Sequence, residues 1–176
     1  MKHIQYRDAF ISFVFMAMIL LMANSIAANE DSVIFLVRHA EKTADEDDPV
    51  LSMDGRQRSL QLAGFLSDAG IDHIHSTDFN RTRETAAPVA KMTGLEIELY
   101  SWDDPLVFAR SLKRDGKRHL VVGHSNTTTK MVTLLGGDPG SDIEDSSEYD
   151  RLYVLTINAS GVSTVLLRYG SASPNP

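Results

Sequence analysis

From Asp31 onward, short β-rich hydrophobic runs alternate with helix-like segments, and this alternation restricts the folds that the chain can adopt. The expected strands are 33–37, 71–76, 97–100, 119–122, 152–157 and 162–167. The expected helices are 54–69, 80–92, 104–115 and 127–135. This order predicts an α/β fold class with three layers, in which helices cover both faces of a mostly parallel central sheet.

Capping and turn residues set the expected ends of these elements. Gly70 is the expected stop of the first helix. The apolar face of that helix is formed by Leu60, Ala63 and Leu66. Asn80 is the expected N-cap of the second helix, and Pro88 is a candidate kink within it. A turn at 158–161 joins the last two strands, which predicts a hairpin at the end of the domain.

Residues 1–28 follow a different pattern from the rest of the chain. A stretch of 15 residues, 9–23, is apolar except for Ser12, which is short for a membrane-spanning helix and typical of a signal peptide. The small residues that follow predict cleavage after Ala27, and an uncleaved N-terminal anchor is the alternative. Both interpretations predict a periplasmic or secreted domain, and cleavage would leave it without stable membrane insertion. The predicted organisation is a signal peptide at 1–28, one domain at 29–170 and a disordered tail at 171–176.

The composition excludes several classes of function. Hydrophobic residues make up 43% of the 176 residues and charged residues 23%, which is an ordinary globular balance. The net charge of -7 argues against nucleic acid as a partner, because a polyphosphate backbone requires a basic face. The chain has no cysteine, which excludes disulfides, thiolate catalysis and cysteine metal sites.

Polar side chains follow three of the expected strands at the point where each strand ends. The first strand runs into Arg38 and His39, the second is followed by Arg81, and the fourth ends in HLVVGHSN, which contains His124. Because ligands of such sheets bind beyond the carboxyl ends of the strands, these four side chains are expected in one crevice. Two arginines and two histidines repel one another unless an anion lies between them, and paired guanidinium groups fit a tetrahedral oxyanion. The pattern therefore predicts a phosphate site in which a histidine can act as nucleophile.

Three segments in this order, LVRHAEK, STDFNRTRETAAPVA and LVVGHSNTT, resemble the histidine phosphatase (phosphoglycerate mutase-like) superfamily, in particular its branch with short SixA-like domains. The similarity runs from about Val33 to Leu167. It implies that His39 is the residue phosphorylated in the intermediate and that Arg38 binds phosphate. It also implies that Arg81 is the second phosphate-binding arginine and that His124 is the second histidine of the site.

Three further residues are candidates for substrate contact, and one position departs from the family pattern. Thr77 stands at the family's hydroxyl position. Asn126, at the expected helix start after His124, and Glu41 are further candidate substrate-binding residues. Glu41 has the alternatives of pairing with a neighbouring base and of capping the loop. Ala40 stands where the signature has glycine, which is tolerated if the backbone there is not left-handed.

The family's usual acid after the second motif, which protonates the leaving oxygen, has no obvious counterpart in this chain. Asp103 follows the third strand and is the preferred candidate. Asp104 is the expected N-cap of the next helix, and Glu96 and Glu98 are expected to face solvent. The implied mechanism needs no cofactor and no metal. A zinc site formed by His73 and His75 with a histidine of the crevice is disfavoured, because the two arginines would repel the cation.

The leading hypothesis is an exported phosphomonoester phosphatase that acts on a small phosphorylated substrate through phosphohistidine on His39. One alternative is a protein phosphohistidine phosphatase, whose phosphoramidate leaving group needs less help from an acid. Another is a phospho-ligand-binding module without turnover. A glycolytic mutase fits less well, because the N-terminal segment is wrong for it and mutases of this family carry longer insertions.

Overall fold

The computed structural model describes residues 31–44 and 47–173 of the chain. The predicted signal peptide and residues 174–176 lie outside the described residues, and the predicted domain boundaries stay a prediction. The elements, in chain order, are β1 (Ser32–Arg38), α2 (Met53–Phe65), β2 (His73–Ser76), α3 (Asn80–Thr93), β3 (Ile97–Leu99), α4 (Pro105–Leu112), β4 (Arg118–Gly123), α5 (Ser125–Leu135), β5 (Arg151–Asn158) and β6 (Gly161–Arg168).

The strands form one six-stranded sheet with the order β3-β2-β4-β1-β5-β6. Strands β3, β2, β4 and β1 are parallel to their neighbours, whereas β5 runs antiparallel to both β1 and β6. The hairpin expected at the end of the domain is therefore present. The predicted α/β fold class with a mostly parallel sheet is confirmed.

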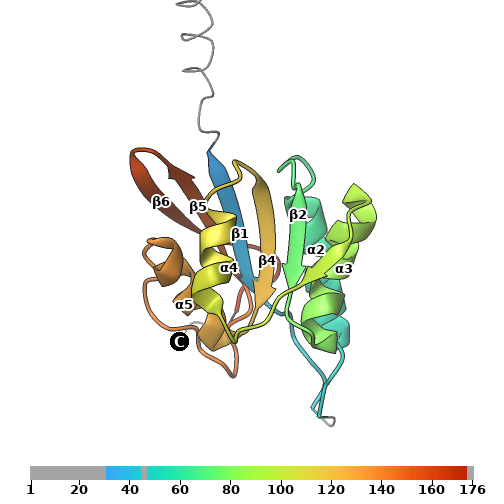
Figure 1. Cartoon of the computed structure of the whole chain (residues 1–176). Helices are drawn as coiled ribbons and strands as arrows, with labels where there is room; N and C mark the ends of the chain where they lie inside the picture. The colour runs from blue at the N-terminus through green and yellow to red at the C-terminus, as the bar shows by residue number, and fades with distance from the viewer. Residues whose placement is uncertain (1–30, 45–46, 174–176) are drawn as a thin grey trace, which may run out of the picture. The chain divides into compact units, whose positions relative to one another are not determined.

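Two apolar layers lie on opposite faces of the sheet, because successive side chains of a strand point to opposite faces. On β1, Phe35 and Val37 belong to the layer that contains residues of α2 and α3. Ile34 and Leu36 belong to the layer that contains residues of α4 and α5. This gives the three-layer arrangement seen in Figure 1, in which both faces of the sheet are covered by helices.

The ends of the four expected helices differ from the sequence-based expectations, and α4 ends at Leu112 instead of residue 115. Helix α2 ends at Phe65, and a turn leads to Gly70, whose positive φ of 65° is a conformation that other residues rarely adopt. Leu60 was expected on the buried face of α2, but 59% of its surface is exposed. Helix α5 begins at Ser125, two residues earlier than expected, because His124 acts as its N-cap. Helix α3 continues through Pro88 to Thr93.

The N-terminus of α3 is capped by a residue distant in sequence. Phe79, and not Asn80, occupies the N-cap position and has no capping side chain. The backbone N–H of Asn80 instead donates to the carboxylate of Asp48 (3.0 and 3.2 Å). The prediction of Asn80 as the cap was therefore wrong, because a carboxylate from the preceding acidic loop takes that role.

The described chain continues past the end of the predicted domain. Ser173 accepts a hydrogen bond from the backbone N–H of Tyr149 and donates its own N–H to Asp150 (3.0 and 3.1 Å). Residues 171–173 of the predicted tail are thus held against the domain at Ser173. Within residues 31–44 and 47–173, no helix is both long enough and apolar enough to cross a membrane.

Candidate active site

The neighbouring strands β1 and β4 bring the first and third sequence motifs together. In their parallel register Arg38 is the partner of Gly123, and the N–H of His39 donates to the carbonyl of Gly123 (2.8 Å). His124 follows directly, and the centroids of the His39 and His124 rings lie 5.5 Å apart. The predicted meeting of the two histidines at the carboxyl ends of the strands is thus found in the structure.

His39 is held as a neutral imidazole with one defined tautomer. Its ring is 3% exposed, and Nδ1 lies 2.8 Å from the carbonyl oxygen of Ala40. Because a carbonyl can only accept, Nδ1 carries the proton and Nε2 keeps its lone pair. Burial, together with the positive charge of Arg38, lowers the pKa of His39 to about 3. Near neutral pH the ring therefore presents a nucleophilic nitrogen.

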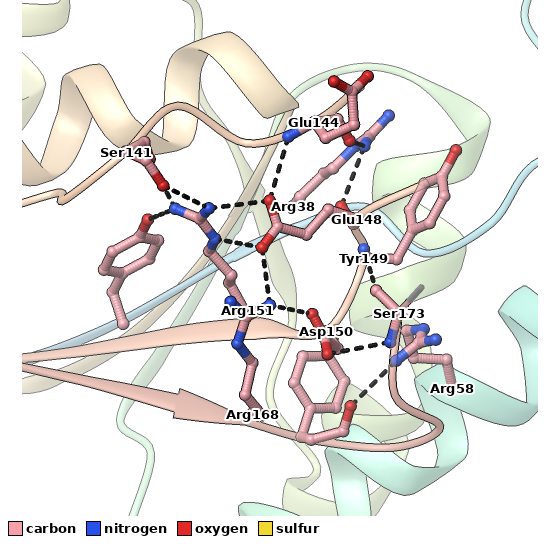
Figure 2. Close-up of polar contacts among 12 residues, drawn as sticks. Arg38, Arg58, Ser141, Glu144, Glu148, Tyr149, Asp150, Arg151, Arg168 and Ser173 are labelled. Atoms are coloured by element: carbon pink, nitrogen blue, oxygen red, sulfur yellow. Dashed lines mark hydrogen bonds and ion pairs between the residues drawn. The ribbon is translucent and has the colours of Figure 1, made fainter. Parts of the chain in front are cut away.

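Arg38 is anchored by the loop between α5 and β5. Its side chain is 2% exposed, and Nη1 donates to the carbonyls of Glu144 and Glu148 (both 3.1 Å). Nη2 donates to the carbonyl of Asp145 and to its carboxylate (2.7 and 2.9 Å). The guanidinium also lies over the ring of Tyr149 (4.1 Å), a cation–π contact, and Figure 2 shows Arg38 among these loop residues. The loop thus fixes the plane of the guanidinium.

The second motif contributes the partners of His124. Nε2 of His124 lies 3.0 Å from the hydroxyl of Thr77, and Nδ1 lies 3.4 Å from Nη2 of Arg81. Since arginine can only donate, Nδ1 accepts and Nε2 carries the proton that it donates to Thr77. Burial and the charges of Arg81 and Arg38 lower the pKa of His124 to about 4. His124 is therefore a neutral donor near the nucleophile.

Aromatic side chains form part of the wall around these groups. The guanidinium of Arg81 lies 4.3 Å from the ring centroid of Phe79, and the Phe79 ring meets His124 edge to face (5.1 Å). The ring centroid of Tyr149 lies 6.1 Å from that of His39. Such contacts position the guanidinium groups without adding a counter-charge.

Other predicted site residues are placed differently. The carboxylate of Glu41 pairs with the guanidinium of Arg58 (2.7 Å), as one of its alternative interpretations predicted. Asn126 is exposed in the first turn of α5. The carboxylate of Asp103 is exposed and accepts from the hydroxyl of Ser101 (2.6 Å). No hydrogen bond or ion pair in the described part of the chain joins Asp103 to the two histidines or the two arginines, and its role as the acid stays a prediction.

The other acidic candidates, and the alanine of the first motif, lie where the sequence predicts. Asp104 is the N-cap of α4, and Glu98 is exposed, as predicted. Glu96 is also exposed. Ala40 is buried and does not have a positive φ, so alanine is compatible with the backbone at this position of the signature.

Three residues of the site escaped prediction. The first is Asp48, whose Oδ1 lies 3.5 Å from Nη1 of Arg81. The others are Ser125 and Asp145, which lie next to Arg38, and the hydroxyl of Ser125 donates to Oδ1 of Asp145 (2.5 Å). Ser125 could have been found as the residue after His124. Asp48 and Asp145 lie in acidic loops without periodicity, where no local pattern indicates a partner.

A second histidine cluster lies elsewhere on the sheet. His73 and His75 of β2 share one face, as predicted, and their rings stack with that of His119 from β4 (5.2 and 5.3 Å). Nε2 of His75 lies 3.0 Å from Nδ1 of His119. Among the described residues, no group of three or more histidine, aspartate or glutamate side chains is arranged to hold a metal ion.

The first two motifs lie in a region of the chain that matches a known protein family. Residues 34–101, which include Arg38, His39, Thr77 and Arg81, match the model of the histidine phosphatase superfamily (branch 1). The resemblance to this superfamily is confirmed. The protein named "Probable phosphoglycerate mutase GpmB" of Escherichia fergusonii is 36% identical over 73 residues, which cover 38% of this chain and 34% of that protein. The matched stretch thus spans about a third of the length of the curated relatives.

Solved structures share the fold over most of their length. The structure of the protein histidine phosphatase SixA complexed with tungstate has a TM-score of 0.61 at 18% identity, covering 79% of this chain and 96% of that chain. A phosphoserine phosphatase from Entamoeba histolytica in complex with 3-phosphoglyceric acid has a TM-score of 0.54 at 16% identity, covering 80% and 97%. At these identities the likeness shows the histidine phosphatase fold. The two neighbours hold an oxyanion and a small phosphorylated ligand, respectively.

Proposed function

We propose that this protein is an exported phosphomonoester phosphatase that acts through a phosphohistidine intermediate on His39. One observation carries the proposal: His39 donates from Nδ1 to Ala40, so that Nε2 is unprotonated within a group of cationic side chains. A non-catalytic binding module has no need of a buried, neutral histidine whose free lone pair is aimed by a hydrogen bond. The tautomer that the Ala40 carbonyl requires therefore supports turnover over binding alone.

In the proposed reaction, Nε2 of His39 attacks phosphorus in line while the ester oxygen leaves. Arg38 and Arg81 stabilise the charge on the phosphoryl oxygens, and His124 is held beside them by Thr77 and Arg81. Nε of each arginine is buried without a hydrogen-bond partner in the described part of the chain. Because a buried donor without an acceptor costs free energy, phosphate oxygens at these groups would be stabilising. Water then attacks the phosphohistidine and releases phosphate.

The proposal is tested with p-nitrophenyl phosphate, with and without a chelator. His39→Ala should lower kcat by at least about a thousandfold, because the nucleophile is lost. His73→Ala, which removes a half-exposed histidine of the second cluster, is the matched control and should retain activity. Rapid denaturation in alkali should trap a phosphorylated wild-type chain. Equal turnover by His39→Ala would contradict the assignment of the nucleophile.

A protein phosphohistidine is the second candidate substrate. The fold is shared over 96% of the solved protein histidine phosphatase and over 97% of the phosphoserine phosphatase, so substrates of both classes are tested. Cleavage of a phosphoramidate also requires less help from an acid than cleavage of an alkyl ester. A phosphohistidine peptide and an alkyl phosphate should be compared by kcat/KM. A preference for the peptide of at least about a hundredfold, which is some 3 kcal/mol, would favour this candidate.

Export is proposed from residues 1–28 alone and needs its own test. The chain with a C-terminal tag should appear in the periplasmic fraction of a Gram-negative host, and mass spectrometry should find Ala28 at the mature N-terminus. An intact N-terminus in the membrane fraction would indicate the uncleaved anchor. Full-length protein in the cytoplasm would contradict export.

A further inference from the structure

A carboxylate from the acidic loop, Asp145, lies on groups that are suited to bind phosphate. Its Oδ1 accepts from Nη2 of Arg38 (2.9 Å) and from the hydroxyl of Ser125 (2.5 Å). The loop reaches this position because Arg38 also binds the carbonyls of Glu144 and Glu148, and Figure 2 shows these contacts. The carboxylate thus takes the place of an oxyanion beside the first motif.

The groups that stabilise the carboxylate of Asp145 are a hydrogen-bond donor and cationic side chains, and the rest of the side chain faces solvent. The hydrogen bond from Ser125 and the charges of Arg38 and Lys42 favour its ionised form and lower its pKa. Asp145 in turn interacts favourably with Arg81 of α3 and with His124 at the start of α5. These include the groups that are proposed to hold the phosphoryl oxygens. A carboxylate and a bound phosphate would therefore compete for the same electrostatic site.

The tether of Asp145 is weak enough for phosphate to displace it. The side chain of Asp145 is 79% exposed, so its carboxylate can move into solvent, whereas the buried Arg38 (2% exposed) stays in place. A phosphate dianion carries more charge and more acceptor oxygens than one carboxylate, and it can bind both arginines at once. Its entry should move the carboxyl group from Arg38 and Ser125 to a position beside the phosphate.

We propose that Asp145 is the acid–base residue of the phosphatase reaction: phosphate replaces its carboxylate on Arg38 and Ser125, and the displaced carboxyl group then carries the proton. This inference rests on the proposed phosphatase function. In the first half-reaction the P–N bond to His39 forms, the P–O bond to the leaving group breaks, and the carboxylic acid of Asp145 gives its proton to the leaving oxygen. In the second half-reaction, the oxygen of a water molecule attacks phosphorus and the P–N bond breaks. The Asp145 carboxylate takes the proton that this water molecule loses.

The change of partner explains how the same residue can be both an anion and an acid. In the empty site the Ser125 hydrogen bond and Arg38 hold the pKa of Asp145 below its ordinary value. Bound phosphate removes both donors and adds negative charge nearby, and each of these changes raises the pKa of the carboxyl group. Substrate binding thus favours uptake of the proton that the leaving oxygen needs.

The other carboxylates near the site are already engaged by fixed partners. Glu41 pairs with the buried Arg58, and Asp48 caps α3 while it contacts Arg81. Asp103 bonds to Ser101 after β3, a strand separated from β4 by β2. Among these acids, the partners of Asp145 are the ones that phosphate itself would take. This distinguishes it from Asp103, the acid that the sequence favoured.

The test compares Asp145→Asn with Asp142→Asn, an exposed carboxylate in the same loop, as the charge-matched control. The readout is kcat/KM for p-nitrophenyl phosphate and for glycerol 2-phosphate, since kcat/KM reports the step in which the ester bond breaks. Asp145→Asn should lose at least about a hundredfold more on the alkyl ester, whose leaving oxygen needs a proton, than on the aryl ester. Its inhibition constant for inorganic phosphate should fall, because the competing charge is gone.

The outcomes separate this inference from the function on which it rests. Equal losses on both esters, or a ratio that matches that of Asp142→Asn, would overturn Asp145 as proton carrier while the phosphatase function stands. An unchanged inhibition constant would overturn the competition for the phosphate site. Wild-type protein that hydrolyses neither ester would remove the phosphatase function, and the role of Asp145 with it.

Discussion

At the scale of single residues, the hydroxyl of Thr77 connects the second histidine to the rest of the second motif. It accepts from Nε2 of His124 (3.0 Å) and donates to the hydroxyl of Thr82 (3.1 Å). Both contacts are inside the domain, where Thr77 is 6% exposed. The orientation of the His124 ring therefore depends on Thr77 at Nε2 and on Arg81 at Nδ1.

Thr77→Val keeps the shape of the side chain but leaves the Nε2–H of His124 without this acceptor. Loss of one buried hydrogen bond costs about 1–3 kcal/mol, so kcat/KM for p-nitrophenyl phosphate should fall roughly tenfold or more. Thr93→Val is the matched control, because the hydroxyl of Thr93 bonds to the carbonyl of Val89 at the far end of α3. Equal activity of the two variants would show that Thr77 does not orient His124.

Glu41 can be assigned either to the substrate or to the fold, and one variant distinguishes them. Arg58 is 4% exposed and bonds to Glu41 through Nε and Nη2, with distances of 2.7–3.0 Å. Glu41→Gln leaves this buried guanidinium without its counter-charge, so the free energy of unfolding should fall by about 2–4 kcal/mol. Urea denaturation measures this change. A tenfold rise in KM with unchanged stability would instead support the predicted substrate contact.

At the scale of elements, helix α2 reaches the first motif through a close backbone contact. A Cβ atom at Gly55 would lie 2.0 Å from the carbonyl oxygen of Glu41, a distance that forces the helix away from the loop after His39. The same helix contains Gly64, where a Cβ atom would meet nothing within 4 Å. The two glycines thus differ in their surroundings within one helix.

Gly55→Ala should lower the free energy of unfolding by about 2–3 kcal/mol, because the helix and the loop must move apart. Gly64→Ala should raise it by about 0.5–1 kcal/mol, because alanine is the better helix former and meets no obstacle. Chemical denaturation of both variants gives the comparison. Similar effects of the two substitutions would contradict a tight contact between α2 and Glu41.

The elements also show where sequence-based prediction succeeds. Strand ends were predictable because an apolar run that stops at Arg38 or before His124 marks the edge of a parallel sheet. The loop after α5 was not, because its position depends on hydrogen bonds between Arg38 and main-chain carbonyls more than 100 residues later. The same holds for Asp48, whose capping role depends on the distant start of α3. Local patterns do not encode such long-range contacts.

At the scale of the whole molecule, buried histidines make stability depend on pH. Burial is the main cause that lowers the pKa of His39 to about 3 and that of His75 and His124 to about 4. For His75, the neighbouring His119 lowers it further, whereas Glu98 and Asp115 oppose the shift. His75 also contacts Phe108 of α4 edge to face (5.2 Å). A proton on His75 would therefore place a charge in the packed interface between α4 and the sheet.

These histidines should make the domain less stable in acid. Their folded-state pKa values lie below the unfolded value of about 6.5, so the unfolded chain binds more protons as the pH falls. The stabilising contribution is complete above pH ~6.5 and is lost progressively toward pH ~4. Each histidine lowers the free energy of unfolding by at most about 1.4 kcal/mol for each pH unit in this range. Urea midpoints at pH 7, 5.5 and 4.5 should fall in that order.

His75→Gln should reduce the dependence of the urea midpoint on pH more than His73→Gln, a substitution of its more exposed neighbour. An identical pH dependence in both variants would mean that the acid sensitivity arises outside His75.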